Sequence, residues 1–272
     1  MIMLSGRTFD ISEIINEYHP IGIERQVLRT LSESNDTYRY DSLNQLKFEL
    51  RLRKEIVNAA RVLNRSAFSF AVFRKSKCNE EYWDRTPNGG FRLKEGVKPS
   101  IAINDILQNG EKYATECATA MIIVYYIALL NIFLVDGFNK LFLKIYLMNW
   151  HSIDPLLKEV GMPNKVADIL LGDRGYFVNP DVDPMTPEWQ GENVIVLPGE
   201  MYYGHGIGIT SARGFIYVLN RKRKEDATKT AYFLDEAARP DFKRLANIYY
   251  KEVPQSTSLK WKPFPEPMRK KL

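Results

Sequence analysis

The sequence has only two cysteines, Cys78 and Cys117, among its 272 residues. Two cysteines exclude a disulfide-rich scaffold and any zinc site built from four thiolates. No repeat with a period of about 20 to 50 residues is present, which excludes solenoid and propeller folds. Apolar residues make up 45% of the chain and charged residues 26%, so a disordered or collagen-like chain is also excluded. We therefore expect a folded protein with a substantial core.

Excess charge of one sign is confined to the C-terminal segment. The net charge is +5, and residues 254–272 carry five basic residues against one acidic residue. The remaining chain is close to neutral, which argues against a broad basic groove for nucleic acid. Four prolines in the same segment oppose regular structure. We expect one folded domain at 1–250 and a mobile, basic tail at 251–272, either solvated or holding an anionic partner.

Long uncharged runs are absent except for one, CATAMIIVYYIALLNIFLV at 117–135. The run is long enough to be a candidate membrane span. However, it is flanked by Glu116 and Asp136, and the mean hydropathy of the chain is −0.30. We therefore expect a buried central helix and no membrane span. The N-terminal sequence MIMLSGRTFDISEI lacks the pattern of a secretory signal, so we expect no signal peptide.

The apolar spacing predicts helices first and strands later. Predicted helices lie at 41–63, 100–108, from 117 onward, at 138–150 and at 227–238. Predicted strands lie at 68–73, 193–197 and 201–209, with a hairpin turn at 88–90 and a loop-rich segment at 172–193. This order indicates the α+β class, as one compact domain with a central apolar helix against an antiparallel sheet.

Cys117 is the candidate nucleophile. It begins the long apolar helix, and a helix N-terminus favours the thiolate, which is the reactive form of cysteine. The neighbouring Glu116 is placed to move protons, although its negative charge opposes thiolate formation. The alternative is that Cys117 is an unreactive core residue. Cys78 lies in a polar segment, and we expect it to be an inert surface thiol.

A proton acceptor for the thiol is expected on the predicted hairpin, which carries Glu192 and His205. If Leu197 pairs with Tyr202, Glu192 and His205 are diagonal neighbours on one face of the sheet. A slip of one residue in this register would place them on opposite faces. Cysteine at a helix start followed by histidine and a carboxylate on later strands is the order of papain-like thiol enzymes.

Several stretches carry a resemblance to a known family. They are KFELRLRKEIVNAARVLNRS (47–66), EKYATECATAMIIVYYIALL (111–130), NWHSID (149–154), DRGYFVNPDVDP (173–184), WQGENVIVL (189–197) and GHGIGI (204–209). Over about residues 1–245 the sequence resembles the protein-glutamine gamma-glutamyltransferases of spore-forming bacilli. The resemblance implies a single papain-like domain of the NlpC/P60 type that needs neither calcium nor another cofactor. The segment 152–171 departs from the family, because its sequence looks more helical than the corresponding loop of the family.

The resemblance also assigns roles to individual residues. It implies that Cys117 is the nucleophile, Glu192 the catalytic carboxylate, Glu116 an auxiliary carboxylate and His205 a residue of secondary importance. The aromatic side chains that it places along the substrate passage are Phe70, Trp150 and Trp189. No metal site is implied.

The implied activity is acyl transfer through a thioester on Cys117, with release of ammonia. The partners would be proteins with glutamine and lysine side chains in the spore coat, reached from the cytoplasm of the sporulating mother cell. One alternative is a papain-like cysteine peptidase or amidase, in which His205 would be the main base. Two others are a non-catalytic coat protein with Cys117 in its core and a membrane-anchored protein.

Overall fold

Helices form much of the first half of the chain in the computed structural model, which describes residues 1–252. From residue 253 on, the predicted tail at 251–272 lies outside the described residues. The helices are α1 (Ile11–Tyr18), α2 (Ile23–Glu33), α3 (Leu43–Arg65), α4 (Pro99–Gln108), α5 (Cys117–Leu141), α6 (Ala212–Asn220) and α7 (Phe242–Glu252).

Within the described residues the strands form four sheets. Three are small: β2 (Arg7–Thr8), β1 (Ile2–Leu4) and β3 (Tyr38–Tyr40); β4 (Ser69–Phe70) and β7 (Ala114–Thr115); and β5 (Trp83–Arg85), β6 (Phe91–Leu93) and β8 (Tyr146–Leu147). The fourth is antiparallel and has the order β12 (Gly208–Ser211), β11 (Met201–Gly204), β10 (Gly191–Leu197), β9 (Arg174–Val178) and β13 (Tyr232–Phe233).

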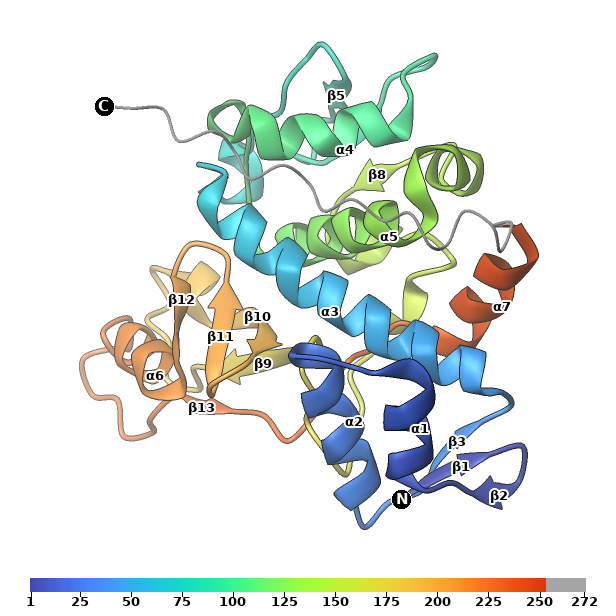
Figure 1. The fold of residues 1–272 in the computed structure, drawn as a ribbon. Helices are drawn as coiled ribbons and strands as arrows, with labels where there is room; N and C mark the ends of the chain where they lie inside the picture. The colour runs from blue at the N-terminus through green and yellow to red at the C-terminus, as the bar shows by residue number, and fades with distance from the viewer. Residues whose placement is uncertain (253–272) are drawn as a thin grey trace, which may run out of the picture.

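The centre of the fold is α5, and Figure 1 shows α3 crossing beside it. Every residue of α5 from Ala118 to Leu130 is buried, and α3, α4 and β10 pack around the helix. Among the described residues it is the one helix long and apolar enough to cross a membrane, but 83% of its apolar window is buried. A helix that is apolar on all sides is one that is buried on all sides. The prediction of a central core helix is confirmed.

The predicted further helix at 138–150 is confirmed only over its first residues. After a kink at Leu134, where φ is 59°, α5 continues through Leu141, and the prediction is wrong from residue 142 on. The ring of Phe142 packs onto Tyr126 with 5.3 Å between centroids, which holds the end of the helix against the core. The chain then forms β8, whose pairing with β6 requires an extended backbone.

The five-stranded sheet lies between two apolar layers. On β10, Ile195 and Leu197 face the large core built on α3 and α5, whereas Val194 packs with Phe177 and Phe215 against α6. This alternation follows from the two-residue period of a strand. Figure 1 shows α6 on the outer side of the sheet, away from α3. The sheet therefore presents one face to the core built on α3 and α5 and the other face to α6.

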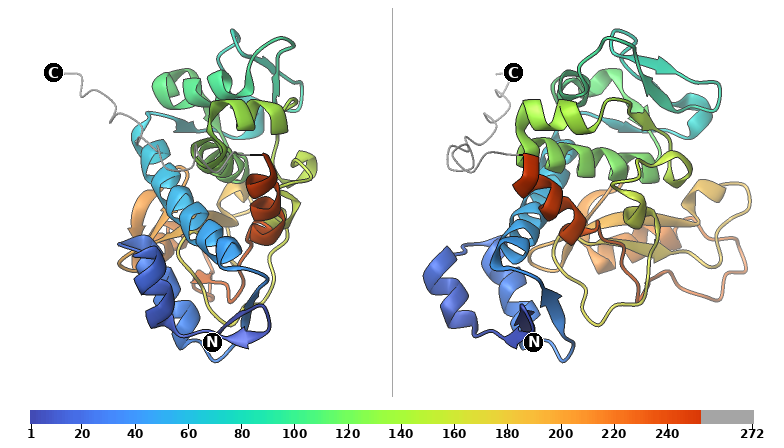
Figure 2. Two further views of the ribbon diagram at one scale, coloured as in Figure 1. Left: turned by 45° about the vertical axis from the view of Figure 1, so that its right-hand side comes forward. Right: turned by 90° about the vertical axis from the view of Figure 1, so that its right-hand side faces the viewer.

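The N-terminal segment, for which the sequence predicts no element, forms a second small core. Its sheet and the helices α1 and α2 pack against α3 and lie at the lower end of both views in Figure 2. The buried members include Ile14, Leu28, Leu31, Leu46 and Leu50. Because α3 contributes to both cores, the N-terminal segment is joined to the rest of the fold.

Most predictions for the first half are confirmed. The predicted helices at 41–63 and 100–108 correspond to α3 and α4, and the turn at 88–90 joins β5 to β6. The predicted strand at 68–73 is shorter than expected and is limited to β4. Helices, an antiparallel sheet and a shared core confirm the mixed helix-and-sheet class.

Predictions for the second half are less accurate. The segment 172–193 contains β9 as well as loops, and the predicted helix at 227–238 is wrong because this segment holds β13. The predicted strand at 201–209 is divided into β11 and β12 at Gly206, where φ is 100°. The insert at 152–171, expected to be helical, contains only short 3₁₀ turns such as Lys158–Gly161.

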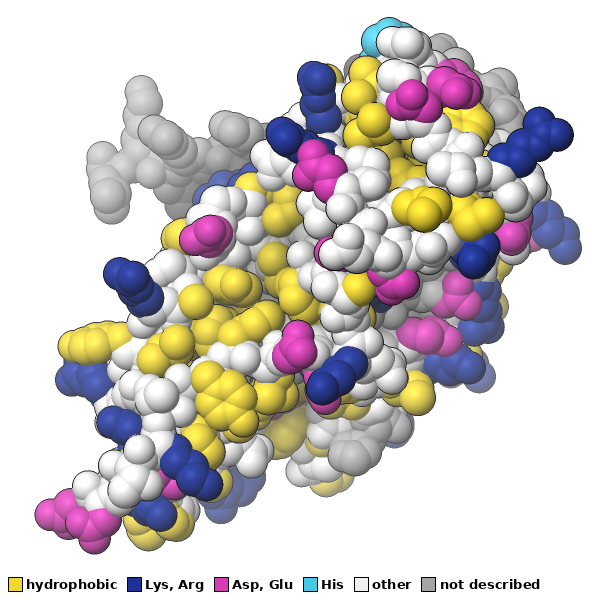
Figure 3. Space-filling view, turned by 90° about the horizontal axis from the view of Figure 1, so that it is seen from below, with side chains coloured by type: hydrophobic (Ala, Val, Ile, Leu, Met, Phe, Trp, Pro, Cys, Tyr) yellow, Lys and Arg dark blue, Asp and Glu magenta, His cyan; other side chains and the backbone are white. Residues whose placement is uncertain are grey.

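One face of the molecule carries a broad group of apolar side chains. Figure 3, a view from below, shows them across the left half of that face, with acidic and basic side chains around them. Exposed apolar side chains among charged ones are normal, because apolar atoms contribute more than half of the accessible surface of a folded protein.

Candidate active site

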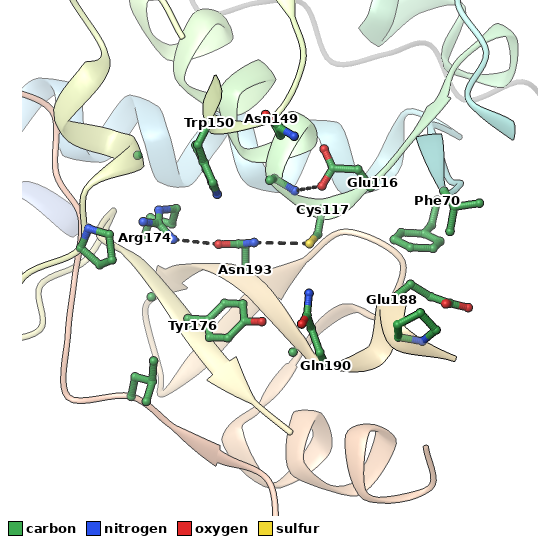
Figure 4. A pocket seen from close by; sticks show the side chains of 18 of the residues that line it. Phe70, Glu116, Cys117, Asn149, Trp150, Arg174, Tyr176, Glu188, Gln190 and Asn193 are labelled. Carbon is green, nitrogen blue, oxygen red and sulfur yellow. Dashed lines mark hydrogen bonds between the residues drawn. The ribbon is translucent and has the colours of Figure 1, made fainter. Parts of the chain in front are cut away.

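A cavity of about 630 Å³ opens beside the N-terminus of α5. Its walls come from elements far apart in the chain, including the segment around β4, the start of α5, the segment 149–163 and strands β9 and β10 (Figure 4). The residues that matter for chemistry are Phe70, Glu116, Cys117, Trp150, Arg174, Tyr176, Glu188 and Asn193. Aromatic and apolar walls with a few polar groups are typical of ligand sites.

Glu116 determines where α5 begins. As the N-cap residue, it accepts hydrogen bonds from the backbone N–H groups of Ala118 and Thr119, at 2.6 and 2.7 Å. The Thr119 hydroxyl donates to the same carboxylate. These bonds satisfy donors that a helix N-terminus leaves unpaired. Burial raises the pKa of Glu116, and the same hydrogen bonds oppose that shift. The predicted auxiliary carboxylate is thus held mainly as a helix cap.

Cys117, the first residue of α5, is partly exposed and lines the cavity. Burial raises the pKa of its thiol, and the negative charges of Glu192 and Glu116 raise it further. A hydrogen bond from Asn193 acts in the opposite direction. Both carboxyl groups predicted for the site therefore lie within electrostatic range of the sulfur.

The hydrogen-bond donor on the sulfur is Asn193, which the sequence analysis missed. Its Nδ2 lies 3.4 Å from Cys117 Sγ, and its Oδ1 accepts from Arg174 Nη1 at 2.8 Å. Arg174 also donates from Nε to the carbonyl of Val160 at 2.8 Å, and its guanidinium lies 4.5 Å from the ring centre of Trp150. Figure 4 shows the resulting line from Arg174 through Asn193 to Cys117.

Strand pairing explains why Arg174 and Asn193 meet. Arg174 on β9 lies opposite Ile195 on β10, and Tyr176 lies opposite Asn193. Arg174 and Asn193 are therefore diagonal neighbours on one face, within reach of long side chains. Both residues lie in short segments that carry the family resemblance, DRG and GEN. The pairing itself was not predicted, because the sequence of β9 indicates a loop.

Glu192 lies behind the cavity wall, on the face of β10 that Asn193 does not occupy. A β carbon at Gly204 would be only 2.8 Å from Glu192 Cγ, so the missing side chain of this glycine leaves the space for Glu192. Glu192 is 3% exposed, and within residues 1–252 its Oε1 has no hydrogen-bond partner. Burial raises the pKa of Glu192 well above its usual range, and the charge of Glu116 adds to the shift.

The predicted register of the hairpin is wrong by one residue. Leu197 lies opposite Met201 rather than Tyr202, and Val194 lies opposite Gly204. His205 follows the last residue of β11, and its side chain does not lie beside that of Glu192 as predicted. Instead, a backbone hydrogen bond from His205 reaches the Glu192 carboxyl and lowers its pKa.

The imidazole of His205 is directed to other partners. Its Nε2 lies 3.0 Å from the Ser69 carbonyl oxygen, and its Nδ1 lies 3.3 Å from the Tyr203 hydroxyl. Because a carbonyl can only accept, Nε2 carries the proton and Nδ1 accepts from the tyrosine. The ring stacks on Phe68 at 4.5 Å between centroids, and burial lowers the pKa of His205 to about 4. The described contacts thus hold His205 as a neutral packing residue, apart from the thiol.

Two of the three predicted aromatic residues line the cavity, namely Phe70 and Trp150. Trp189 is not part of the lining. It packs on Phe70 with 6.4 Å between ring centroids, and the Lys222 ammonium lies 5.0 Å from the centre of its ring. Trp189 therefore supports Phe70 from outside.

The second cysteine is separate from the cavity. Cys78 is half-buried rather than exposed as predicted, and its sulfur lies 3.9 Å from the Trp83 carbonyl. Burial raises the pKa of Cys78 to about 11, which disfavours the reactive thiolate. In residues 1–252, no group of three or more histidine, cysteine and acidic side chains is arranged to hold a metal ion.

Comparison with known proteins identifies the family. The family model described as protein-glutamine gamma-glutamyltransferase matches residues 1–249. The chain belongs to this family. Protein-glutamine gamma-glutamyltransferases of Bacillus mycoides (strain KBAB4) and Bacillus cereus (strain AH820) are 40% and 39% identical to it over 257 residues. Each match covers 94% of this chain and 92% of the relative.

A solved structure supports the same assignment. The transglutaminase from Geobacillus stearothermophilus (without C-terminal extension) is 47% identical, with a TM-score of 0.72. The match covers 76% of this chain and 98% of that one. As a member of the gamma-glutamyltransferase family, the protein is an acyltransferase.

Proposed function

We propose that the protein forms ε-(γ-glutamyl)lysine crosslinks between proteins through a thioester on Cys117. The main observation in support is the Cys117 sulfur in the wall of a cavity, with an amide donor on it and a buried carboxyl of raised pKa nearby. A thiol nucleophile and a proton-holding acid are the two groups that acyl transfer from a carboxamide needs.

In the first half-reaction, the sulfur of Cys117 attacks the carboxamide carbon of a glutamine side chain. A sulfur–carbon bond forms, the carbon–nitrogen bond breaks, and the leaving nitrogen takes up a proton to become ammonia. Glu192 is proposed to give its own proton to that nitrogen and to take up the proton of the thiol in exchange, because a buried carboxyl with a raised pKa is a competent acid near neutral pH. The backbone N–H of Cys117 is the proposed oxyanion donor, because Ala118 and Thr119 already donate to Glu116.

In the second half-reaction, a lysine amine attacks the thioester carbon. The nitrogen–carbon bond of the isopeptide forms, the carbon–sulfur bond breaks, and the proton lost by the amine returns to the sulfur through Glu192. Water competes with the amine, so the walls must exclude it. Phe70 and Trp150 are suited to this because their rings cover the cavity and fit the apolar stem of lysine.

The same proposal extends to fold type, setting and metal requirement. We assign the arrangement of a cysteine-bearing central helix against an antiparallel sheet to the papain-like NlpC/P60 type, with His205 displaced from its usual role. The proposed substrates are spore-coat proteins, encountered in the mother-cell cytoplasm and then in the coat, and no calcium is required. The relatives named above come from Bacillus, the group to which the sequence resemblance points.

The experiment that tests this function follows a fluorescent primary amine into casein, and ammonia release, with EDTA present. Wild type should incorporate the amine and Cys117→Ala should not. Cys78→Ala is the matched control, and it should retain wild-type activity. Equal activity of wild type and Cys117→Ala would show that the thioester assignment is wrong. Hydrolysis without amine incorporation would favour the amidase alternative.

A further inference from the structure

Arg174 is a buried cation without an acidic partner among the described residues. Its side chain contacts a carbonyl, an amide and an indole face, all of which are neutral. The other deeply buried arginine, Arg53, differs: it forms ion pairs with Glu49 at 2.8 Å and Asp173 at 2.7 Å. Burying a charge without a counterion is costly. An anion that forms during the reaction would provide the missing partner.

The orientation of Asn193 connects this charge to the sulfur. Its Oδ1 accepts from the guanidinium, which can only donate, so its NH₂ group must face Cys117. The reverse orientation would place donor against donor at Arg174. Arg174 therefore fixes the amide with a hydrogen-bond donor directed at the thiol.

Most charged groups near Cys117 are acidic and disfavour the thiolate, an effect that the hydrogen bond from Asn193 opposes. Glu116 lies at the helix cap, Glu192 on β10 and the Tyr176 phenol on β9, and these groups are acidic or neutral. Glu188 and Glu236 also line the cavity. Among the described residues, Arg174 is a cation whose charge interacts with Cys117, and His205 is bound elsewhere. In thiol enzymes a neighbouring cation commonly stabilises the thiolate.

We propose that Asn193 is a catalytic residue that donates its amide hydrogen to the Cys117 thiolate, and that Arg174 is the positioning residue that orients this amide and supplies the compensating charge. This inference rests on the proposed role of Cys117 as nucleophile. In this proposal an arginine–asparagine pair stabilises the thiolate, as a protonated histidine does in other thiol enzymes. The thiol proton passes to solvent or, once Glu192 has given up its own proton, to that carboxylate. The negative charge remains on sulfur, facing Nδ2.

The test measures alkylation of Cys117 by iodoacetamide against pH, with mass spectrometry of the Cys117 peptide in the full-length protein. Removing a cation near a thiol raises its pKa by one unit or more, so Arg174→Gln should alkylate about ten-fold more slowly near pH 7. Asn193→Ala and Asn193→Asp should also be slower, with Asp slower than Ala because it places an acceptor against the sulfur. Arg174→Lys should give an intermediate profile, since it keeps the charge but loses the planar fork.

Arg92→Gln is the matched control, because Arg92 also lies over an aromatic ring, Tyr146, but outside the cavity lining. Its pH profile should equal that of wild type. If Arg174→Gln does not fold, the two Asn193 variants decide the question. Wild-type alkylation profiles for Asn193→Ala and Asn193→Asp would overturn the inference.

Amine incorporation into casein is measured in parallel, so that two failures can be told apart. If wild type does not incorporate amine but the Arg174 and Asn193 variants alkylate more slowly, the proposed function fails and this inference stands. If wild type incorporates amine but the variants alkylate like wild type, this inference fails and the proposed function stands.

Discussion

The Nε2 atom of His205 donates to the carbonyl oxygen of Ser69 across 3.0 Å, which ties the end of β11 to β4. This bond takes the ring proton away from the cavity and leaves Nδ1 facing the Tyr203 hydroxyl. A histidine held in this way has a structural role between two sheets. It is not placed to act as the base of Cys117.

The first prediction concerns His205→Gln, which keeps an amide donor for the Ser69 carbonyl. Because the imidazole contacts neither the sulfur nor the substrate cavity, amine incorporation should fall by less than ten-fold, measured on folded protein. A papain-like peptidase or amidase that uses His205 as its base would instead lose activity by about 10²-fold or more. Loss of that size, with an unchanged melting temperature, would contradict the structural role.

The second prediction is a pH dependence of stability that comes from His205. Burial lowers its folded-state pKa from 6.5 to about 4, so the unfolded chain binds a proton in this interval that the folded chain does not. Stability from this residue is therefore complete above about pH 6.5 and is lost as pH falls toward 4, by up to about 3 kcal/mol.

Urea unfolding at pH 7, 5.5 and 4.5 measures this effect. His205→Gln has no titrating ring and should lose less stability between pH 7 and 4.5 than wild type does. Parallel curves for the two proteins would mean that the histidine is not buried in its neutral form.

The third prediction separates the two carboxyl groups. Glu192→Gln keeps the shape of the side chain but cannot exchange a proton, so amine incorporation should fall by about 10²- to 10⁴-fold. Iodoacetamide alkylation of Cys117 should not fall, because the replacement adds no negative charge beside the thiol. Glu116→Gln is the matched comparison, and it should lose less activity than Glu192→Gln. A larger loss for Glu116→Gln would mean that Glu116 is the main proton carrier and Glu192 the auxiliary carboxylate.

The fourth prediction uses the space between Gly204 and Glu192. Gly204→Ala would place a β carbon 2.8 Å from Glu192 Cγ and 2.6 Å from a ring carbon of Phe215. We expect a loss of about 1–3 kcal/mol in the free energy of unfolding, because both neighbours are packed. Gly161→Ala is the control, since its new carbon would meet Trp150 at an ordinary 3.5 Å. Equal stability of the two variants would show that Glu192 does not need the space.

The sequence was enough to place the candidate nucleophile, Cys117, but not the strand pairing next to it. The uncharged run of α5 and the charged residue before it were enough to place Cys117 at a helix start. The hairpin register was missed because the turn has positive φ at both Gly199 (75°) and Glu200 (56°), which shortens the connection. A left-handed glutamate is rare, so pattern alone does not indicate it.

The Arg174–Asn193 pair was missed for a different reason. It depends on pairing between two strands, one of which lies among prolines and turn-forming residues that indicate a loop. Side chains that meet diagonally across such a pair leave no fixed spacing in the sequence. Periodicity therefore identified the helices, whereas the polar contacts of the thiol required the structure.

The hydrogen bond between Asn193 and Cys117 joins residues separated by 76 positions in the chain. The sulfur therefore gains its amide donor only when β9 and β10 have docked on α5. We expect a chain released before that step to carry a dormant sulfhydryl. Folding would then limit when the activity appears, so that a newly synthesised molecule cannot crosslink other proteins before its tertiary structure has formed.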